Sequence, residues 1–291
     1  MGDCSIKIRL PEKLVKGAGI SGGRFLPGWV YRFEIEIKNR GDKEKVVSIN
    51  TTFGNGLTYL GGLSLQGKDQ GIVDKIVIVQ PSIEIGNNNL IVFANNIKLS
   101  PKSTNKIYFD LGLYDRFTVN SVENSGEKIP HRSFLHITAH VLEDGEIVSD
   151  KIVCEAMDCQ ISMQLNQNKA HTGNETRVYI QCRASQYDLI RKVYIKCILD
   201  NGEEYISGSC NLEPNNIYKF NNRTVLKWFY DVVNPMEEIR LSFKIKIKQN
   251  YIDGKVIKSG DRLLNSVNVN GVNNFSYTQC PDTSKDYVEI V

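Results

Sequence analysis

Residues 27–42, PGWVYRFEIEIKNRGD, decide the fold class of this chain. Apolar and charged side chains alternate along this segment. The apolar set is Trp29, Tyr31, Phe33, Ile35 and Ile37, and the charged set is Arg32, Glu34, Glu36 and Lys38. A period of two places the two sets on opposite faces of a β-strand. Because turn-forming residues bound the segment on both sides, it predicts a strand of an antiparallel sheet with one buried face and one wet face.

Strand patterns recur along the chain, whereas helix patterns are nearly absent, and only short pieces such as Ser185–Ile190 are compatible with a turn of helix. The other predicted strands of the N-terminal half are Cys4–Leu10, Val46–Thr52, Lys75–Val79, Asn89–Phe93, Lys106–Leu111, Phe134–Leu142 and Glu146–Cys154. Short strands at this density, separated by Gly, Asn, Asp and Ser turns, predict an all-β sandwich.

The chain also repeats itself once. The segment Gly56–Gly62, GLTYLGG, returns as Gly202–Gly208, GEEYISG. Three further landmarks recur in the same order: Gly28 and Gly173 before a strand, Pro101 and Pro235 before Phe109 and Phe243, and Val141 and Val267 before Gly145 and Gly271. We therefore predict two tandem antiparallel β-sandwiches, residues 1–153 and 160–291, joined by a linker at residues 154–159. Two copies are too few for a solenoid, which needs at least about three.

The composition narrows the possible partners and location of the protein. The 291 residues include 36 basic and 33 acidic ones, and the basic residues alternate with apolar ones instead of clustering. This balance argues against nucleic acid as a partner. The first residues lack the apolar region of an export signal, and no run approaches the roughly 18 apolar residues of a membrane span. We expect a protein made in the cytoplasm without an export signal and with no membrane partner.

The sequence contains only weak matches to the motifs of cofactor, metal and catalytic sites. Gly17–Gly22 spells G-x-G-x-x-G, but the next residues, Gly23–Pro27, cannot form the helix that a dinucleotide site needs, so a flexible glycine loop is expected. Of His131, His136 and His140, the last two share a strand face roughly 13 Å apart, too far to hold one metal ion unaided. A solvent-facing pair is expected there. The carboxylate pairs Glu203–Glu204 and Glu237–Glu238 lie at or near turns, where solvated charge is expected. We therefore predict no catalysis, no metal and no cofactor.

Seven cysteines are the unusual feature of the composition. An odd number leaves at least one thiol unpaired within a monomer, so this thiol either pairs with another molecule or stays free. Cys154 and Cys159 lack the second ligand pair that zinc needs, so a local disulfide, an intermolecular disulfide and two free thiols stay open. Cys182 and Cys197 fall on the apolar faces of their strands, where they either pack as small hydrophobes or form a bridge.

The strings GWVYRFEIEIKNRGD and NGLTYLGG, a Pro-started IYF strand and, in the second copy, LLNSVNVNG resemble the bacterial conserved-repeat domain known as domain of unknown function eleven. This resemblance implies an immunoglobulin-like β-sandwich used as a repeated module in surface proteins. Some related surface sandwiches carry a Lys–Asn isopeptide bond. The first copy has Lys7 in its first strand but Ile137 where the last-strand asparagine belongs. The second copy has Asn265 at that last-strand position but no lysine in residues 160–165, so we predict no such crosslink.

The Asn-, Lys- and Ile-rich composition and the segment Tyr114–Pro130 resemble clostridial versions of this domain. Among them are proteins without an export signal that build the appendages of endospores. The resemblance implies a location on the spore surface, reached by synthesis in the mother-cell cytoplasm and later exposure to an oxidising exterior. Its implied partners are copies of itself and other spore-surface proteins.

Our hypothesis from the sequence is a structural subunit that joins head to tail into a fibre. Cys4 shares the parity of the apolar residues in its strand, and Cys280 lies in the C-terminal tail, so both are candidates for intermolecular disulfides, with Cys154 and Cys159. The tail from Phe275 either adds as a strand to the next subunit or packs on its own domain. The alternative function is a surface-binding module for a glycan or host protein, with Trp228–Tyr230 as the place to look.

Overall fold

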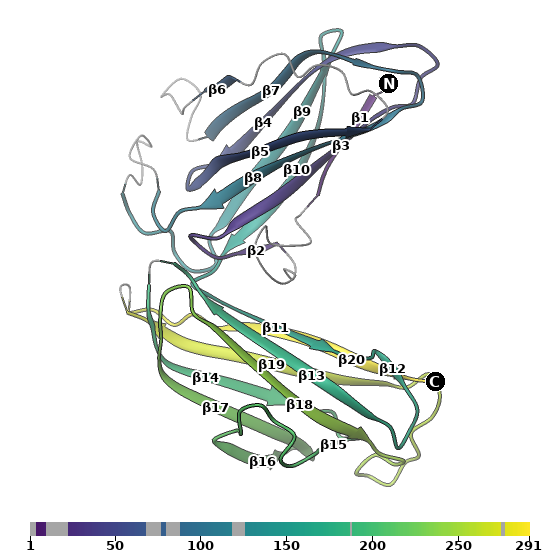
Figure 1. Cartoon of the computed structure of the whole chain (residues 1–291), viewed down its shortest axis with the longest axis vertical. Coiled ribbons are helices and arrows are strands. Elements are labelled where there is room, and N and C mark those ends of the chain that lie inside the picture. Colours follow the sequence, from purple (N-terminus) through teal and green to yellow (C-terminus); the bar gives the residue numbers. More distant parts are fainter. Residues whose placement is uncertain are drawn as a thin grey trace. The chain divides into compact units, whose positions relative to one another are not determined.

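The computed structural model describes residues 4–9, 23–67, 77–79, 88–117, 126–186, 188–274 and 277–291. The chain divides into two compact units, Met1–Met157 and Asp158–Val291. Each unit is a sandwich of one four-stranded and one six-stranded sheet (Figure 1). All the named strands pair antiparallel except two short ones, which run parallel to the last strand of each unit. The predicted fold class, two tandem immunoglobulin-like β-sandwiches, is confirmed.

The described residues of the first unit form ten strands, in sheets of order β1-β3-β8-β5 and β2-β10-β9-β4-β7-β6. They are β1 (Cys4–Arg9), β2 (Arg24–Phe25), β3 (Val30–Asn39), β4 (Lys45–Gly54), β5 (Leu57–Gly67), β6 (Val77–Val79), β7 (Asn88–Leu99), β8 (Thr104–Leu113), β9 (Phe134–Glu143) and β10 (Glu146–Ala156). Each predicted strand overlaps one of these, but the predicted Asn89–Phe93 covers only the first half of β7.

The second unit repeats this topology strand for strand, with orders β11-β13-β18-β15 and β12-β20-β19-β14-β17-β16. Its strands are β11 (Cys159–Leu165), β12 (Lys169–Ala170), β13 (Glu175–Ala184), β14 (Ile190–Ile198), β15 (Glu203–Tyr205), β16 (Asn216–Phe220), β17 (Arg223–Val233), β18 (Glu238–Ile247), β19 (Arg262–Asn273) and β20 (Asp282–Ile290). Adding ten to each label of the first unit gives the corresponding strand of the second.

The opening segment forms β3, and its apolar face lies in the core of the first unit. Tyr31, Phe33, Ile35 and Ile37 are all buried. Phe33 pairs with Phe109 of β8, and their rings stack with centroids 5.6 Å apart. Burying side chains of this size stabilises a fold by about 1.5–3 kcal/mol each. Strand β3 is an inner strand of its sheet, and its apolar side chains therefore contribute several such terms to the stability of the first unit.

One of the repeated landmarks, the pair Gly28 and Gly173, is a repeated turn. Gly28 and Gly173 have φ of 85° and 87°, and their amides donate to the last residues of β8 and β18. A left-handed conformation of this kind favours glycine, which explains the recurrence. The landmark Val141–Gly145 is not equivalent to Val267–Gly271, because Gly145 turns between β9 and β10 whereas Gly271 lies within β19.

Two sequence expectations are wrong, and one open alternative is decided. The predicted linker at 154–159 is mostly strand, because Cys154 belongs to β10 and Cys159 to β11, which leaves only Met157 and Asp158 between them. Of the two alternatives for the C-terminal tail, packing on its own domain describes the structure, because Asp282–Ile290 pairs with β19 as β20. No helix forms over the described part of Ser185–Ile190. The loop Gly17–Gly22 lies outside the described residues.

Candidate functional site: surface networks, thiols and a buried carboxyl

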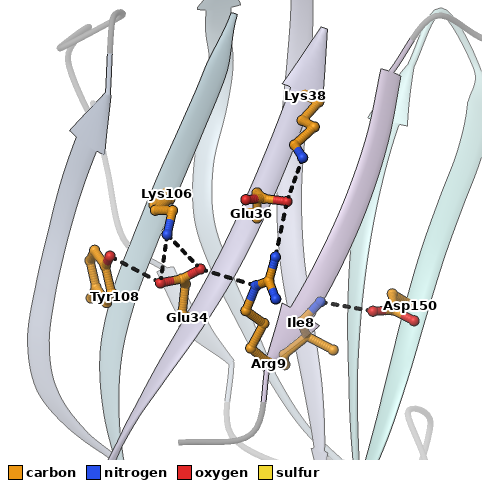
Figure 2. A network of polar contacts seen from close by, with 8 residues as sticks. All are labelled: Ile8, Arg9, Glu34, Glu36, Lys38, Lys106, Tyr108 and Asp150. Carbon is orange, nitrogen blue, oxygen red and sulfur yellow. Dashed lines mark hydrogen bonds and ion pairs between the residues drawn. The ribbon is translucent and has the colours of Figure 1, made fainter. Parts of the chain in front are cut away.

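The wet face of β3 carries a network of ion pairs with β1 and β8 (Figure 2). Glu34 accepts from Lys106 Nζ at 3.0 Å and from the Tyr108 hydroxyl at 3.0 Å. Arg9 Nε lies 3.3 Å from the same carboxylate, and Arg9 Nη2 lies 3.4 Å from Glu36. The charged residues predicted to face outward therefore do so, but they bind one another instead of standing free. Pairs of this kind contribute about 0.2–1 kcal/mol each.

The network favours the charged forms of Glu36 and Lys106 and the neutral form of Tyr108. The hydrogen bond from Lys38 holds the pKa of Glu36 below its ordinary value. The hydrogen bond to Glu34 raises the pKa of Lys106. For Tyr108, burial and then the bond to Glu34 raise the pKa of the phenol. At neutral pH these shifts keep Glu36 and Lys106 ionised and Tyr108 neutral, so none of the three groups is tuned for proton transfer.

A shallow groove of about 360 Å³ runs along the outer edge of β1. Its charged lining consists of Lys7, Arg9, Glu36, Lys38, Arg40 and Asp150. Asp150 of β10 accepts a hydrogen bond from the amide of Ile8 at 2.8 Å, so the last strand of the unit ties down the first (Figure 2). The groove has polar walls and an excess of cations, and it contains no described nucleophile paired with a base.

The predicted intermolecular thiols are all buried in this conformation: Cys4, Cys154, Cys159 and Cys280. Burial raises the pKa of the Cys154 thiol, which lowers its reactivity. Cys159 Sγ lies 3.5 Å from Cys182 Sγ, beyond the roughly 2.05 Å of a disulfide. None of the four is placed to meet a thiol of another molecule, so an intermolecular disulfide at these positions stays a prediction that requires local opening.

The suggested pair Cys182 and Cys197 lies in the core of the second unit, on β13 and β14 of opposite sheets. Both thiols are free, so the packing alternative describes the observed state. Sequence reasoning missed Cys210, the one cysteine that is only half-buried. The signal was available, because Cys210 lies in the polar turn segment Ser207–Asn211, outside any alternating strand.

A buried polar cluster lies where β15 meets β19. Glu203 accepts a hydrogen bond from Asn265 Nδ2 at 3.1 Å, and Asn265 Oδ1 accepts from the Asp200 amide at 3.0 Å. Burial, followed by the charge of Asp200, raises the pKa of Glu203 to about 8. Glu203 is therefore protonated at neutral pH, and the expectation that both Glu203 and Glu204 are solvated is wrong for Glu203.

The isopeptide expectation placed Ile137 and Asn265 on the last strands, which is wrong, because they lie on the penultimate strands β9 and β19. Lys7 is exposed on the outer face of β1, whereas Ile137 is buried in the core. Asn265 is fully engaged by the cluster around Glu203. The absence of an isopeptide crosslink stays a prediction, which a measurement of the intact mass of the protein would test.

The outer face of the six-stranded sheet in the second unit carries exposed aromatic rings. Tyr194 of β14 and Phe229 of β17 are paired residues with ring centroids 4.8 Å apart. Lys227 Nζ lies 4.4 Å from the Tyr194 ring centroid. Of the predicted aromatic run, Trp228 belongs to the core and donates to the Leu212 carbonyl at 2.9 Å, and Tyr230 packs against the core, so Phe229, which is half-buried, is the residue that contributes to this surface.

The histidines behave as the strand pattern predicts. His136 and His140 lie on the outer face of β9, and His131 lies in the turn before it. The His140 ring is 2.6 Å from Ser149 Oγ, and burial lowers the pKa of the imidazole. Over the described ranges, no group of His, Cys, Asp and Glu is arranged to hold a metal ion. The same ranges contain no helix long and apolar enough to cross a membrane.

The chain matches no protein-family model and no curated protein. Among solved structures it is similar to a red sea bream transglutaminase, with 8% identity and a TM-score of 0.36 over 100% of this chain and 32% of that one. It is similar to a C-terminal fragment of the major pilin GBS80 of Streptococcus agalactiae, with 11% identity and a TM-score of 0.35 over 96% and 90% of the two chains. The full-length major pilin SpaD of Corynebacterium diphtheriae gives 10% identity and a TM-score of 0.35 over 92% and 56%. The chain spans about a third of the transglutaminase, and likenesses this distant carry no inference about function.

Proposed function

We propose that this protein is a structural subunit that assembles head to tail into a surface fibre. The observation that carries the proposal is the strand-for-strand repetition of one sandwich in two units. The two units have the same backbone plan but different surfaces, so a contact between the first unit of one copy and the second unit of the next is heterologous. A heterologous contact that does not close produces an open filament.

The outer faces support a scaffold role. Glu34, Glu36 and their cationic partners are engaged with one another, and the described buried residues form two hydrophobic cores. Ser149 Oγ lies 2.6 Å from the His140 ring, but no third side chain is described that orients this imidazole, and covalent catalysis uses a base that is itself oriented by a third group. A spore surface as the location, and a mother cell as the place of synthesis, are proposals that rest on the sequence resemblance to clostridial appendage proteins.

Disulfide locking is the part of the proposal that the described conformation does not favour, because Cys4 and Cys280 are buried. A lock through either thiol requires its strand or turn to open when subunits join. A non-reducing denaturing gel of assembled material decides this point. Bands of dimer and higher multiples that vanish in Cys4→Ser, Cys280→Ser protein support the lock, and bands that persist exclude it.

The second candidate function is a surface-binding module for a glycan or a host protein. The Tyr194–Phe229 pair favours it, because aromatic side chains beside a few placed polar groups are a common lining of ligand sites. Asn270 and Gln279 lie alongside, joined by a hydrogen bond of 3.1 Å. Binding on a glycan array that disappears in Tyr194→Ala, Phe229→Ala protein would favour this function over the fibre.

The decisive experiment for the fibre is negative-stain microscopy of the purified full chain, with and without reductant. We expect filaments whose length grows with protein concentration. A population that remains monomeric or dimeric over the whole concentration range would contradict the fibre.

A further inference from the structure

The second unit protects most of its sheet edges. An uncovered edge strand offers unpaired amides and carbonyls to any other strand, so natural sheets cover or shorten their edges. The amides of β11 are covered by side chains of β20: Ile161 donates to Asp282 at 2.7 Å, Met163 to Ser284 at 3.1 Å, and Leu165 to Asp286 at 2.8 Å. The first and last strands of the unit thus close one edge together.

The other side of the four-stranded sheet is protected differently. Strand β15 is only three residues long, and the chain beyond it continues along β18. The amide of Ile206 donates to the Lys244 carbonyl at 3.1 Å, and the amide of Asn211 donates to the Ser242 carbonyl at 3.0 Å. On the six-stranded sheet, the edge beside β20 is occupied by the two-residue strand β12.

Strand β16 is the exception, and it borders the six-stranded sheet beyond β17 (Figure 1). All five of its residues, NIYKF, are exposed. The exposed fractions of its large apolar side chains are 44% for Ile217, 36% for Tyr218 and 54% for Phe220. A lysine on an edge strand can discourage pairing with another strand. Here the charged group of Lys219 is turned back onto its own sheet, because its Nζ donates to Thr224 on the neighbouring strand at 2.7 Å.

The hairpin fixes which backbone groups face outward. Strands β16 and β17 are joined by Asn221 and Asn222, whose φ values of 46° and 63° are those of a two-residue type I′ turn. The flanking residues Phe220 and Arg223 pair directly, so they exchange both hydrogen bonds, and alternation turns the amides and carbonyls of Ile217 and Lys219 toward the open side.

We propose that β16 pairs antiparallel with β16 of a second copy of this chain. With Tyr218 opposite Tyr218 on the two-fold axis, Ile217 of each copy meets Lys219 of the other. This register uses all four outward-facing groups on each strand and forms four backbone hydrogen bonds. It also keeps the two lysines apart, whereas centring the axis on Lys219 would place like charges opposite each other, which destabilises a strand pair.

The contact joins two six-stranded sheets into one continuous sheet and covers the exposed rings of Tyr218 and Phe220. It is isologous and closes on itself, so it does not depend on the proposed head-to-tail fibre. A dimer without filaments would support this inference and contradict the fibre, and filaments that lack the β16 pairing would do the reverse.

Proline at position 219 tests the pairing. In Lys219→Pro the missing amide is one that β17 does not use, so the hairpin keeps its own hydrogen bonds while each dimer loses two. The matched control Lys219→Ala removes the charge and keeps the amide. By sedimentation equilibrium of the full chain, we expect Lys219→Pro to raise the dimer dissociation constant at least about tenfold relative to Lys219→Ala. A wild-type chain that stays monomeric, or equal dimerisation by the two variants, would overturn the proposal.

Cysteine crosslinking tests the register in protein that keeps the native edge. In a Cys210→Ser background, Tyr218→Cys places two thiols in a non-hydrogen-bonded pair, with Cβ atoms about 4.5–5.5 Å apart. We expect rapid formation of a disulfide-linked dimer on mild oxidation. Asn216→Cys is the control, because its thiol lies opposite Phe220 of the second copy. If Asn216→Cys crosslinks as fast as Tyr218→Cys, or Tyr218→Cys does not crosslink, the two-fold register is wrong.

Discussion

Glu203 makes the stability of the second unit depend on pH in a direction opposite to that of most carboxylates. Its side chain is 1% exposed, and the pKa of about 8 means that the folded unit retains a proton that the unfolded chain has released. A carboxyl group with a raised pKa contributes stability that is fully present below its unfolded value and is lost as the pH rises through the folded value. The free energy of unfolding therefore falls between about pH 4.5 and 8.

The magnitude follows from the size of the shift. The pKa moves from a reference of 4.5 to about 8, or roughly 3.5 units, and each unit corresponds to about 1.36 kcal/mol. The second unit should thus lose up to about 5 kcal/mol across the window. Replacing the carboxyl with an amide in Glu203→Gln removes the titration and keeps an oxygen to accept from Asn265, so we expect this loss to disappear.

Fluorescence makes the second unit separately measurable. The chain has two tryptophans, Trp29 and Trp228, and Trp228 is buried in the second unit. In a Trp29→Phe background, urea unfolding followed through Trp228 at several pH values gives the stability of that unit. The titratable groups around Glu203 are Asp200, Arg223, Lys248 and Cys197, and they are the same in parent and variant.

The control is Glu204→Gln, which removes the exposed carboxyl next along the strand. We expect it to retain the full pH dependence, whereas Glu203→Gln flattens the curve and is the more stable protein at pH 8. If Glu203→Gln and its parent lose stability equally between pH 5 and 8, the carboxyl is already ionised at neutral pH and our account of the cluster is wrong.

The remaining predictions concern the thiols, the core and the covered edge. A thiol reagent added to native protein should label Cys210 well before the six buried cysteines, and Cys210→Ser should abolish the fast phase seen by absorbance. Phe33→Ala should cost about 3–5 kcal/mol of unfolding free energy in chemical denaturation, since the ring is fully buried. Asp286→Ala should cost about 1–3 kcal/mol by leaving the Leu165 amide without its acceptor, and light scattering should show increased aggregation. A loss below about 1 kcal/mol for Phe33→Ala, or an Asp286→Ala protein as stable and monodisperse as its parent, would contradict this packing.

The sequence was sufficient for the sandwich because the deciding pattern is local. Along β3 every second side chain enters the core, and a period of two records that directly. The repeated turns at Gly28 and Gly173 were visible because a left-handed backbone restricts the choice of residue. Both signals depend on the conformation of a few neighbouring residues, and neither requires knowledge of which strands lie side by side.

The environments of the candidate site residues were harder to predict from the sequence, because they depend on which other strands each residue contacts. Glu203 and Glu204 were interpreted as a solvated pair, yet neighbours on a strand point to opposite faces, and the inner face of β15 is occupied by the core. The place of Cys280 and the tail stayed open in the sequence, although Asp282–Ile290 forms a strand of its own domain. Those residues include the acceptors for β11, and a pattern of polarity along one strand does not distinguish a bond across the sandwich from exposure to water.

The bonds between β11 and β20 also set a condition on the order of synthesis. The two strands that close this edge are the first and the last of their unit, so every residue between them must be made before the edge can be covered. Until then the nascent unit presents a strand whose amides are open to neighbouring chains on the same messenger. Slow translation within the second unit, or crowding of ribosomes there, should thus favour misassembly even when the finished protein is stable.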